Sequence, residues 1–189
     1  GQVDQNGIDR IHGKDVPYMS PSVAFASYLT EHLKQAIDAG VEAIHLEEPE
    51  FWADCGYSEG FKREWQIFYN EPWRDPMSSP DAQFRASKLK SYLYKRTLDR
   101  LCCELKEYAL TTYGRNVRFY VPTHSLVNYS QWKIVSPESS LIDIPAVDGY
   151  IAQIWTGTSR TENVYEGKLK ERTFETAVLG YGVMQELTR

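Results

Sequence analysis

The chain has 189 residues, of which 42% are hydrophobic and 25% are charged, an ordinary composition for a soluble globular protein. Its formal net charge of −5 excludes nucleic acid and anionic membrane surfaces as expected partners, because both call for clustered Lys and Arg. No apolar run approaches the roughly 18 residues that a membrane-spanning helix needs. The chain does not begin with Met, so a preceding leader is conceivable, and cytoplasmic and secreted locations both stay open.

The spacing of apolar residues, with Ser, Gly and Pro at the boundaries, predicts secondary structure along the whole chain. The expected elements are, in order, a strand over 16–19, a helix over 22–39, a strand over 41–46, an irregular segment over 51–80 with a short helical piece over 61–69, a helix over 81–114, a strand over 117–121, a loop over 125–146, a strand over 149–155 and a helix over 171–187. This alternation of strands and helices predicts an α/β protein with a parallel sheet.

Two architectures compete for such a sheet. A doubly wound sheet usually carries a glycine-rich nucleotide site in its first turn, and none of the 12 glycines forms G-x-G-x-x-G or a P-loop. We therefore expect an incomplete (β/α)8 TIM barrel of about four βα units, roughly strands 3 to 6. A complete barrel needs roughly 250 residues. Residues 1–189 are accordingly expected to form a single partial catalytic domain, a fragment of a longer chain.

Polar and aromatic side chains follow three of the four expected strands. Glu47, Glu48 and Glu50 follow the second strand, His124 follows the third, and Trp155 ends the fourth. Catalytic groups of parallel barrels lie at the carboxyl ends of the strands. Crowded carboxylates also raise the pKa of at least one of them, which suits a proton donor. The alternative for the three glutamates is a solvated acidic loop.

The longest recognisable pattern runs from Glu47 to Trp73. It consists of Glu48-Pro49, Cys55-Gly56-Tyr57-Ser58, Phe61 with Trp65 and Tyr69, and Asn70-Glu71-Pro72-Trp73. This set resembles the region after the fourth strand in clan A glycoside hydrolases, most closely the family 42 β-galactosidase-like barrels. In that family an Asn precedes the proton-donating Glu and binds the 2-hydroxyl of the sugar, whereas this chain has Glu47 there.

The resemblance implies a glycosidase that acts on a β-linked sugar by acid/base catalysis with two carboxylates. Glu48 matches the acid/base residue, and Glu47 and Glu50 are expected to hold sugar hydroxyls. The second carboxylate of the family ends the seventh strand, so we expect it outside residues 1–189 and expect the fragment to be inactive alone. The implied partner is a carbohydrate substrate, and no cofactor or metal is expected.

Four further residues are candidates for substrate binding. Trp155 is positioned to stack on a sugar ring, His124 to bond a hydroxyl or the acid/base residue, and Trp52 and Tyr57 to wall a cleft. Each has a structural alternative, since aromatic rings also pack cores and loops and a lone histidine is often structural.

Two other functions stay open. Residues 39–49 also resemble the Asp-Glu-Pro strand of cobalamin-independent methionine synthase, which implies a methyl-transfer barrel with a zinc site built from thiolates and histidine. Cys102 and Cys103 lie in the middle of an expected helix, and the next strand end offers only His124. A barrel that binds carbohydrate without cleaving it is the other alternative, because a fold alone does not fix a function.

Overall fold

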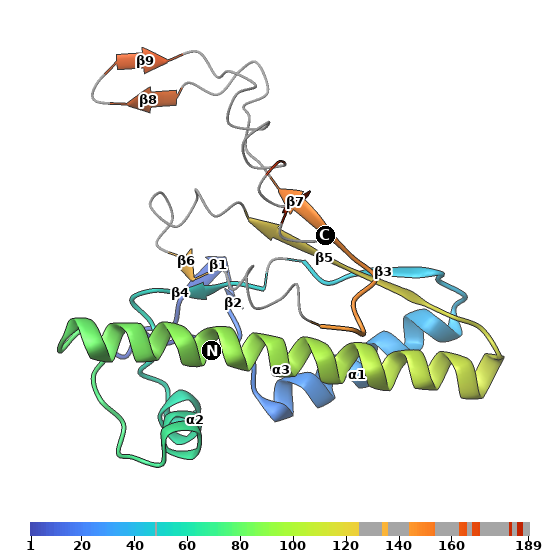
Figure 1. The fold of residues 1–189 in the computed structure, drawn as a ribbon, viewed down its shortest axis with the longest axis horizontal. Coiled ribbons are helices and arrows are strands. Elements are labelled where there is room, and N and C mark those ends of the chain that lie inside the picture. The colour runs from blue at the N-terminus through green and yellow to red at the C-terminus, as the bar shows by residue number, and fades with distance from the viewer. Residues whose placement is uncertain are drawn as a thin grey trace.

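The computed structural model describes residues 1–47, 49–124, 134–135, 144–153, 163–165, 168–170, 182 and 185–186. Figure 1 shows how they are arranged. The helices and strands are, in chain order, β1 (Ile11–Gly13), β2 (Val16–Pro17), α1 (Val23–Asp38), β3 (Ala43–His45), β4 (Phe51–Trp52), α2 (Glu59–Tyr69), α3 (Pro80–Tyr113), β5 (Arg118–His124), β6 (Ile134–Val135), β7 (Gly149–Gln153), β8 (Asn163–Tyr165) and β9 (Lys168–Lys170).

Each helix begins at a serine whose hydroxyl oxygen accepts a backbone N–H of the first turn. Ser22, Ser58 and Ser79 are these caps, and they satisfy donors that have no partner inside the helix. Helices α2 and α3 end at Asn70 and Gly114, whose φ angles of 52° and 66° turn the chain out of the helix. Among the described residues, no helix combines the length and hydropathy needed to cross a membrane.

Replacing the cap of α3 is expected to have a modest effect on stability. Ser79 Oγ accepts the backbone N–H of Ala82 at 3.1 Å. Ser79→Ala removes this acceptor and should lower the free energy of unfolding by about 1 kcal/mol. Ser79→Asp keeps an acceptor oxygen at the helix N-terminus and should stay close to the wild type. Urea unfolding measures both variants, and equal midpoints for Ser79→Ala and the wild type would contradict the assignment.

Three parallel strands form the central sheet, in the order β3-β5-β7. Ile44 pairs with Phe119 and Val121 pairs with Tyr150. The prediction that the runs over 41–46, 117–121 and 149–155 are neighbouring parallel strands is confirmed for 43–45, 118–121 and 149–153, while β5 continues past its predicted end to His124. Residues 154–155, the end of the third run, lie outside the described residues.

Helices α1 and α3 lie on one side of β3 and β5 (Figure 1). The residues that fill the space between these helices and the sheet are Ile37, Ile44, Leu101, Cys102, Leu105, Ala109, Val117 and Phe119. A second group joins α2, β4 and α3, and it consists of Phe51, Cys55, Phe61, Trp65, Ala86, Leu89 and Leu93. The predicted irregular segment 51–80 is therefore packed against α3 rather than extended into solvent.

The prediction of an incomplete (β/α)8 barrel is wrong. The described residues form a small α/β fold with one three-stranded parallel sheet, to which two-stranded antiparallel sheets are added. The strand predicted over 16–19 does not join the parallel sheet. It is β2, which pairs antiparallel with β1 across a tight turn in which Asp15 has a φ of 62°. A barrel needs parallel neighbours on both edges of every strand, and in the described part of the chain β3 and β7 have a neighbour on one edge only.

The C-terminal predictions fall mostly outside the described residues. Only Gly182, Gln185 and Glu186 of the helix predicted over 171–187 are described, and these three are helical. Strands β8 and β9 form an antiparallel pair that the sequence did not predict, with Val164 opposite Leu169.

Candidate functional site

A cleft of about 490 Å³ lies next to the carboxyl end of β3. It is bounded by the β1–β2 hairpin, the first half of α1, the middle of α3 and the residues that follow β3. Its apolar walls come from Val16, Pro17, Met19, Pro21, Phe25, Leu29, Leu33, Leu46, Pro49, Leu98 and Leu101. Its polar or aromatic groups are His12, Tyr18, His45, Glu47, Tyr94 and Thr97. The cleft is therefore lined mainly by apolar side chains, with a few polar groups among them.

The segment that follows β3 brings part of the predicted acidic cluster to this cleft. Glu47 and Pro49 both line it, and the Glu47 side chain is exposed. Glu48, which stands between them in the chain, lies outside the described residues. Glu50 is only 2% exposed and is not one of the residues that line the cleft.

The aromatic candidates Trp52 and Tyr57 have different surroundings, Trp52 as the last residue of β4 and Tyr57 in the loop that follows. The ring of Trp52 meets Tyr18 edge to face, with centroids 5.6 Å apart, and the Arg10 guanidinium lies 4.7 Å from the Trp52 ring centroid. Trp52 thus supports Tyr18, which lines the cleft. Tyr57 donates its hydroxyl to Asp75, and burial together with this bond raises the pKa of Tyr57. The surroundings of Tyr57 are those of a residue that packs a loop.

The remaining two candidates are His124 and Trp155. His124 is the last residue of β5, and its backbone pairs with Gln153 of β7. Trp155 lies outside the described residues. The structure therefore places Glu47 beside the cleft and His124 at the end of a strand of the sheet that contains β3.

Most of the cleft residues were not selected from the sequence, and three of them carry groups that can bond a ligand. His45 lines the cleft, and its ring meets that of Tyr120 edge to face at 5.6 Å. Strand alternation puts His45 on the same face as Glu47, and this spacing was a usable signal. His12 and Tyr18 form the second pair, with His12 Nδ1 2.8 Å from the Tyr18 hydroxyl. They reach the cleft only because β1 and β2 pair as a hairpin, which the sequence pattern did not predict.

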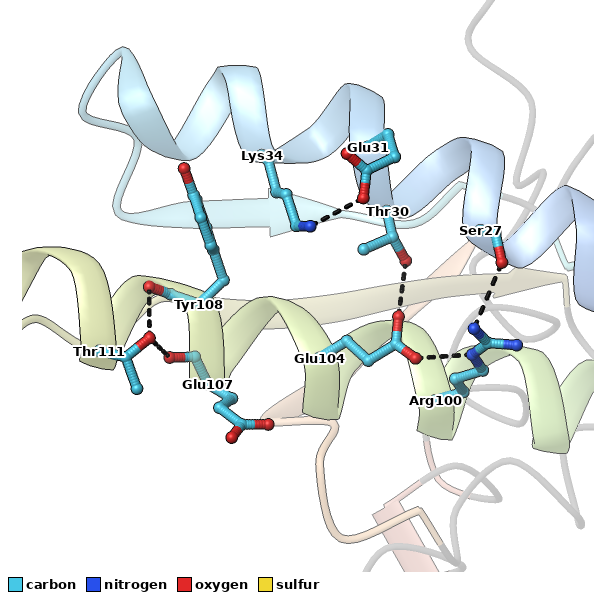
Figure 2. A pocket seen from close by; sticks show the side chains of 9 residues that line it. All are labelled: Ser27, Thr30, Glu31, Lys34, Arg100, Glu104, Glu107, Tyr108 and Thr111. Atoms are coloured by element: carbon cyan, nitrogen blue, oxygen red, sulfur yellow. Dashed lines mark hydrogen bonds and ion pairs between the residues drawn. The ribbon is translucent and has the colours of Figure 1, made fainter.

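A second hollow, of about 330 Å³, separates α1 from α3 (Figure 2). Its polar side chains already bond each other, partly across the two helices (Thr30 to Glu104 and Arg100 to Ser27) and partly within one helix. Glu104 accepts from Thr30 at 3.2 Å and from Arg100 at 2.7 Å, and Lys34 pairs with Glu31 at 2.7 Å. These contacts hold the helices together, so the hollow is not favoured as a site.

Within the described ranges, no three His, Cys, Asp or Glu side chains are grouped so as to hold a metal ion. Burial raises the pKa of the Cys55 thiol to about 11 and that of Cys102 to about 12. Both thiols stay protonated near neutral pH, whereas zinc binds thiolates. These residues therefore give no support to the zinc site of the methyl-transfer alternative.

Comparison with protein-family models, with curated proteins and with solved structures finds no match for this chain.

Proposed function

We propose that the protein is a glycosidase that acts on a β-linked sugar in the cleft beside β3, with Glu48 as the proton donor. The observation that carries the proposal is that Glu47 and Pro49, the neighbours of Glu48 on either side, both line the cleft. The cleft also lies at the carboxyl end of a parallel strand, where α/β proteins commonly bind their ligands.

The chemistry requires an acid that protonates the leaving oxygen and a carboxylate that attacks, or activates water, on the opposite face of the sugar. Glu48 takes the first role in the proposal. His45 and Glu47 share one face of the strand and carry groups that can bond sugar hydroxyls. The aliphatic side chains of Leu29 and Leu33, which line the cleft, suit the apolar face of the sugar or an apolar leaving group. The resemblance assigns the second carboxylate to a later strand, so the assay requires the full-length protein.

The test is hydrolysis of a panel of nitrophenyl β-glycosides by the full-length protein. Leu29→Trp replaces an aliphatic side chain of the cleft with a bulky indole ring. It should lower kcat/KM at least about tenfold, because a substrate that fits an apolar pocket poorly reacts less efficiently by about that factor. Val23→Trp, at a half-exposed position of the same helix that does not line the cleft, is the matched control and should keep wild-type activity. If the wild type binds the sugars but cleaves none, the carbohydrate-binding alternative replaces the proposal.

A further inference from the structure

Gln2 is a fully buried polar residue whose side chain bonds the backbone that follows the acidic cluster. Its Nε2 donates to Glu50 O at 2.7 Å and to Met19 O at 3.2 Å, and its Oε1 accepts the backbone N–H of Trp52 at 2.9 Å. In an extended strand, the C=O of one residue and the N–H of the second residue after it point the same way. The Gln2 side-chain amide therefore bonds this edge of the chain as the N–H and C=O of a single residue in a neighbouring strand would.

Strand β4 is bonded to Gln2 along one edge and is paired with strand β6 along the other. Phe51 and Trp52 pair with β6 in antiparallel fashion. Strand β4 has two residues, too few to hold its own position by pairing along one edge. The side chain of Gln2 supplies the second edge.

Lys90 is the second buried group that bonds this segment. Its side chain comes from α3 and is 1% exposed, and its Nζ donates to Trp52 O and to Ala53 O, both at 3.0 Å. Tyr94, one turn further along α3, donates its hydroxyl to Glu50 O. Burying an amide and an ammonium group is costly unless their hydrogen bonds are satisfied. Here the backbone of residues 50–53 supplies most of these bonds, and Met19 O supplies one more to Gln2.

Gln2 is also bonded, through its own backbone, to residues on either side of the β1–β2 hairpin. Its N–H donates to Tyr18 O at 2.7 Å, and its C=O accepts the N–H of Arg10 at 2.8 Å. The residue thus connects the β1–β2 hairpin, which lines the cleft, with the segment that leaves β3.

We propose that Gln2 and Lys90 are positioning residues that fix residues 50–53, and through them the path of the chain that carries Glu47 and Glu48. The proposal rests on the proposed function for its catalytic consequence, while the fixing of residues 50–53 is measurable without any activity.

Hydrogen exchange tests the fixing of the segment. Gln2→Ala removes the acceptor of the Trp52 N–H, so this amide should exchange at least about tenfold faster than in the wild type, while the amides in the middle of α3 keep their protection. Gln2→Glu keeps an acceptor oxygen for Trp52 but places its second oxygen against Glu50 O and Met19 O, so it should not restore the wild-type protection. Gln5→Ala, at an exposed position of the same segment, is the control. Unchanged exchange at Trp52 in Gln2→Ala overturns the proposal.

Kinetics of the full-length protein test the catalytic consequence. We expect Gln2→Ala to lower kcat at least about tenfold, since a displacement of 1 Å can cost about 100-fold. KM should change less than about threefold, because substrate binding is not removed. Lys90→Met should likewise lower kcat more than it changes KM. Its control is Lys88→Met, at an exposed position of the same helix. Faster exchange with unchanged kcat reduces Gln2 to a structural residue. A wild type without activity overturns the proposed function, and the exchange result alone then decides whether Gln2 fixes the segment.

Discussion

Glu48→Gln is expected to lower hydrolysis of a glycoside with an unactivated leaving group by at least about 100-fold, the usual contribution of general acid catalysis. Glutamine keeps the size of glutamate and removes the proton that the leaving oxygen needs. A nitrophenyl glycoside has a good leaving group and needs less protonation, so its glycosylation step should be partly spared. The measurement is kcat/KM of the full-length protein on both kinds of substrate.

The neighbouring glutamates provide the comparison. Glu47→Gln changes an exposed group of the cleft and should raise KM more than it lowers kcat, because that side chain is assigned to sugar hydroxyls. Glu50→Gln changes a buried residue that does not line the cleft, and its first readout is stability. Near wild-type activity of Glu48→Gln, together with a loss of activity in either neighbour, would show that the proton donor has been assigned to the wrong residue.

The sequence predicted the parallel strands well because their signal is local. Each is a short apolar run, and Ile44, Phe119 and Val121 are buried, two of them against α1 and α3. Closure into a barrel is not a local property. It depends on how many strands pair and on whether both edges of every strand are occupied. The run over 16–19 has the same local pattern as the true parallel strands, and only its pairing with residues 11–13 distinguishes it.

The part of the site that was predicted is likewise the part with a local signal. Glu47 follows β3 directly in the chain, so a strand prediction was enough to find it. His12 and Tyr18 reach the cleft through the hairpin, and Gln2 contacts Glu50 across 48 positions of sequence. No periodicity connects residues so far apart, and the polar type of Gln2 predicts an exposed side chain rather than a fully buried one.

Lys90 is expected to make the stability of the protein depend on pH. Burial lowers the pKa of its ammonium group from 10.5 to about 8. Between about pH 8 and pH 10.5, the unfolded chain therefore binds a proton that the folded chain has released. Rising pH then disfavours unfolding, so the contribution of Lys90 to stability increases through this window and is lost again as the pH falls towards 8.

The size of the effect follows from the width of the window. The difference between 10.5 and about 8 is about 2.5 pH units, and each unit corresponds to about 1.4 kcal/mol, which gives about 3 kcal/mol. Cys55 acts in the opposite direction. Burial, and after it the Asp54 charge, raises the pKa of its thiol from 9.0 to about 11, so Cys55 lowers stability as the pH rises above 9. The Lys90 charge itself lowers the pKa of Cys55, so the difference between the wild type and a Lys90 variant also contains a part that comes from Cys55.

The measurement is the free energy of urea unfolding of the wild type and of Lys90→Met at several pH values from 7.5 to 10.5, with a reductant present. Near neutral pH, the difference in free energy of unfolding between the two proteins has two opposing causes: Lys90→Met loses the bonds to Trp52 O and Ala53 O, and it also removes a buried charge. The sign of this difference is therefore not the test. The test is how this difference in free energy of unfolding changes with pH. A neutral amine still has two N–H groups for the two carbonyls, so the wild type keeps these bonds while it gains about 3 kcal/mol relative to the variant. Lys88→Met, whose side chain is exposed, should run parallel to the wild type. A constant difference between the wild type and Lys90→Met across the window would show that Lys90 keeps its ordinary pKa in the folded protein, and that it is reached by water.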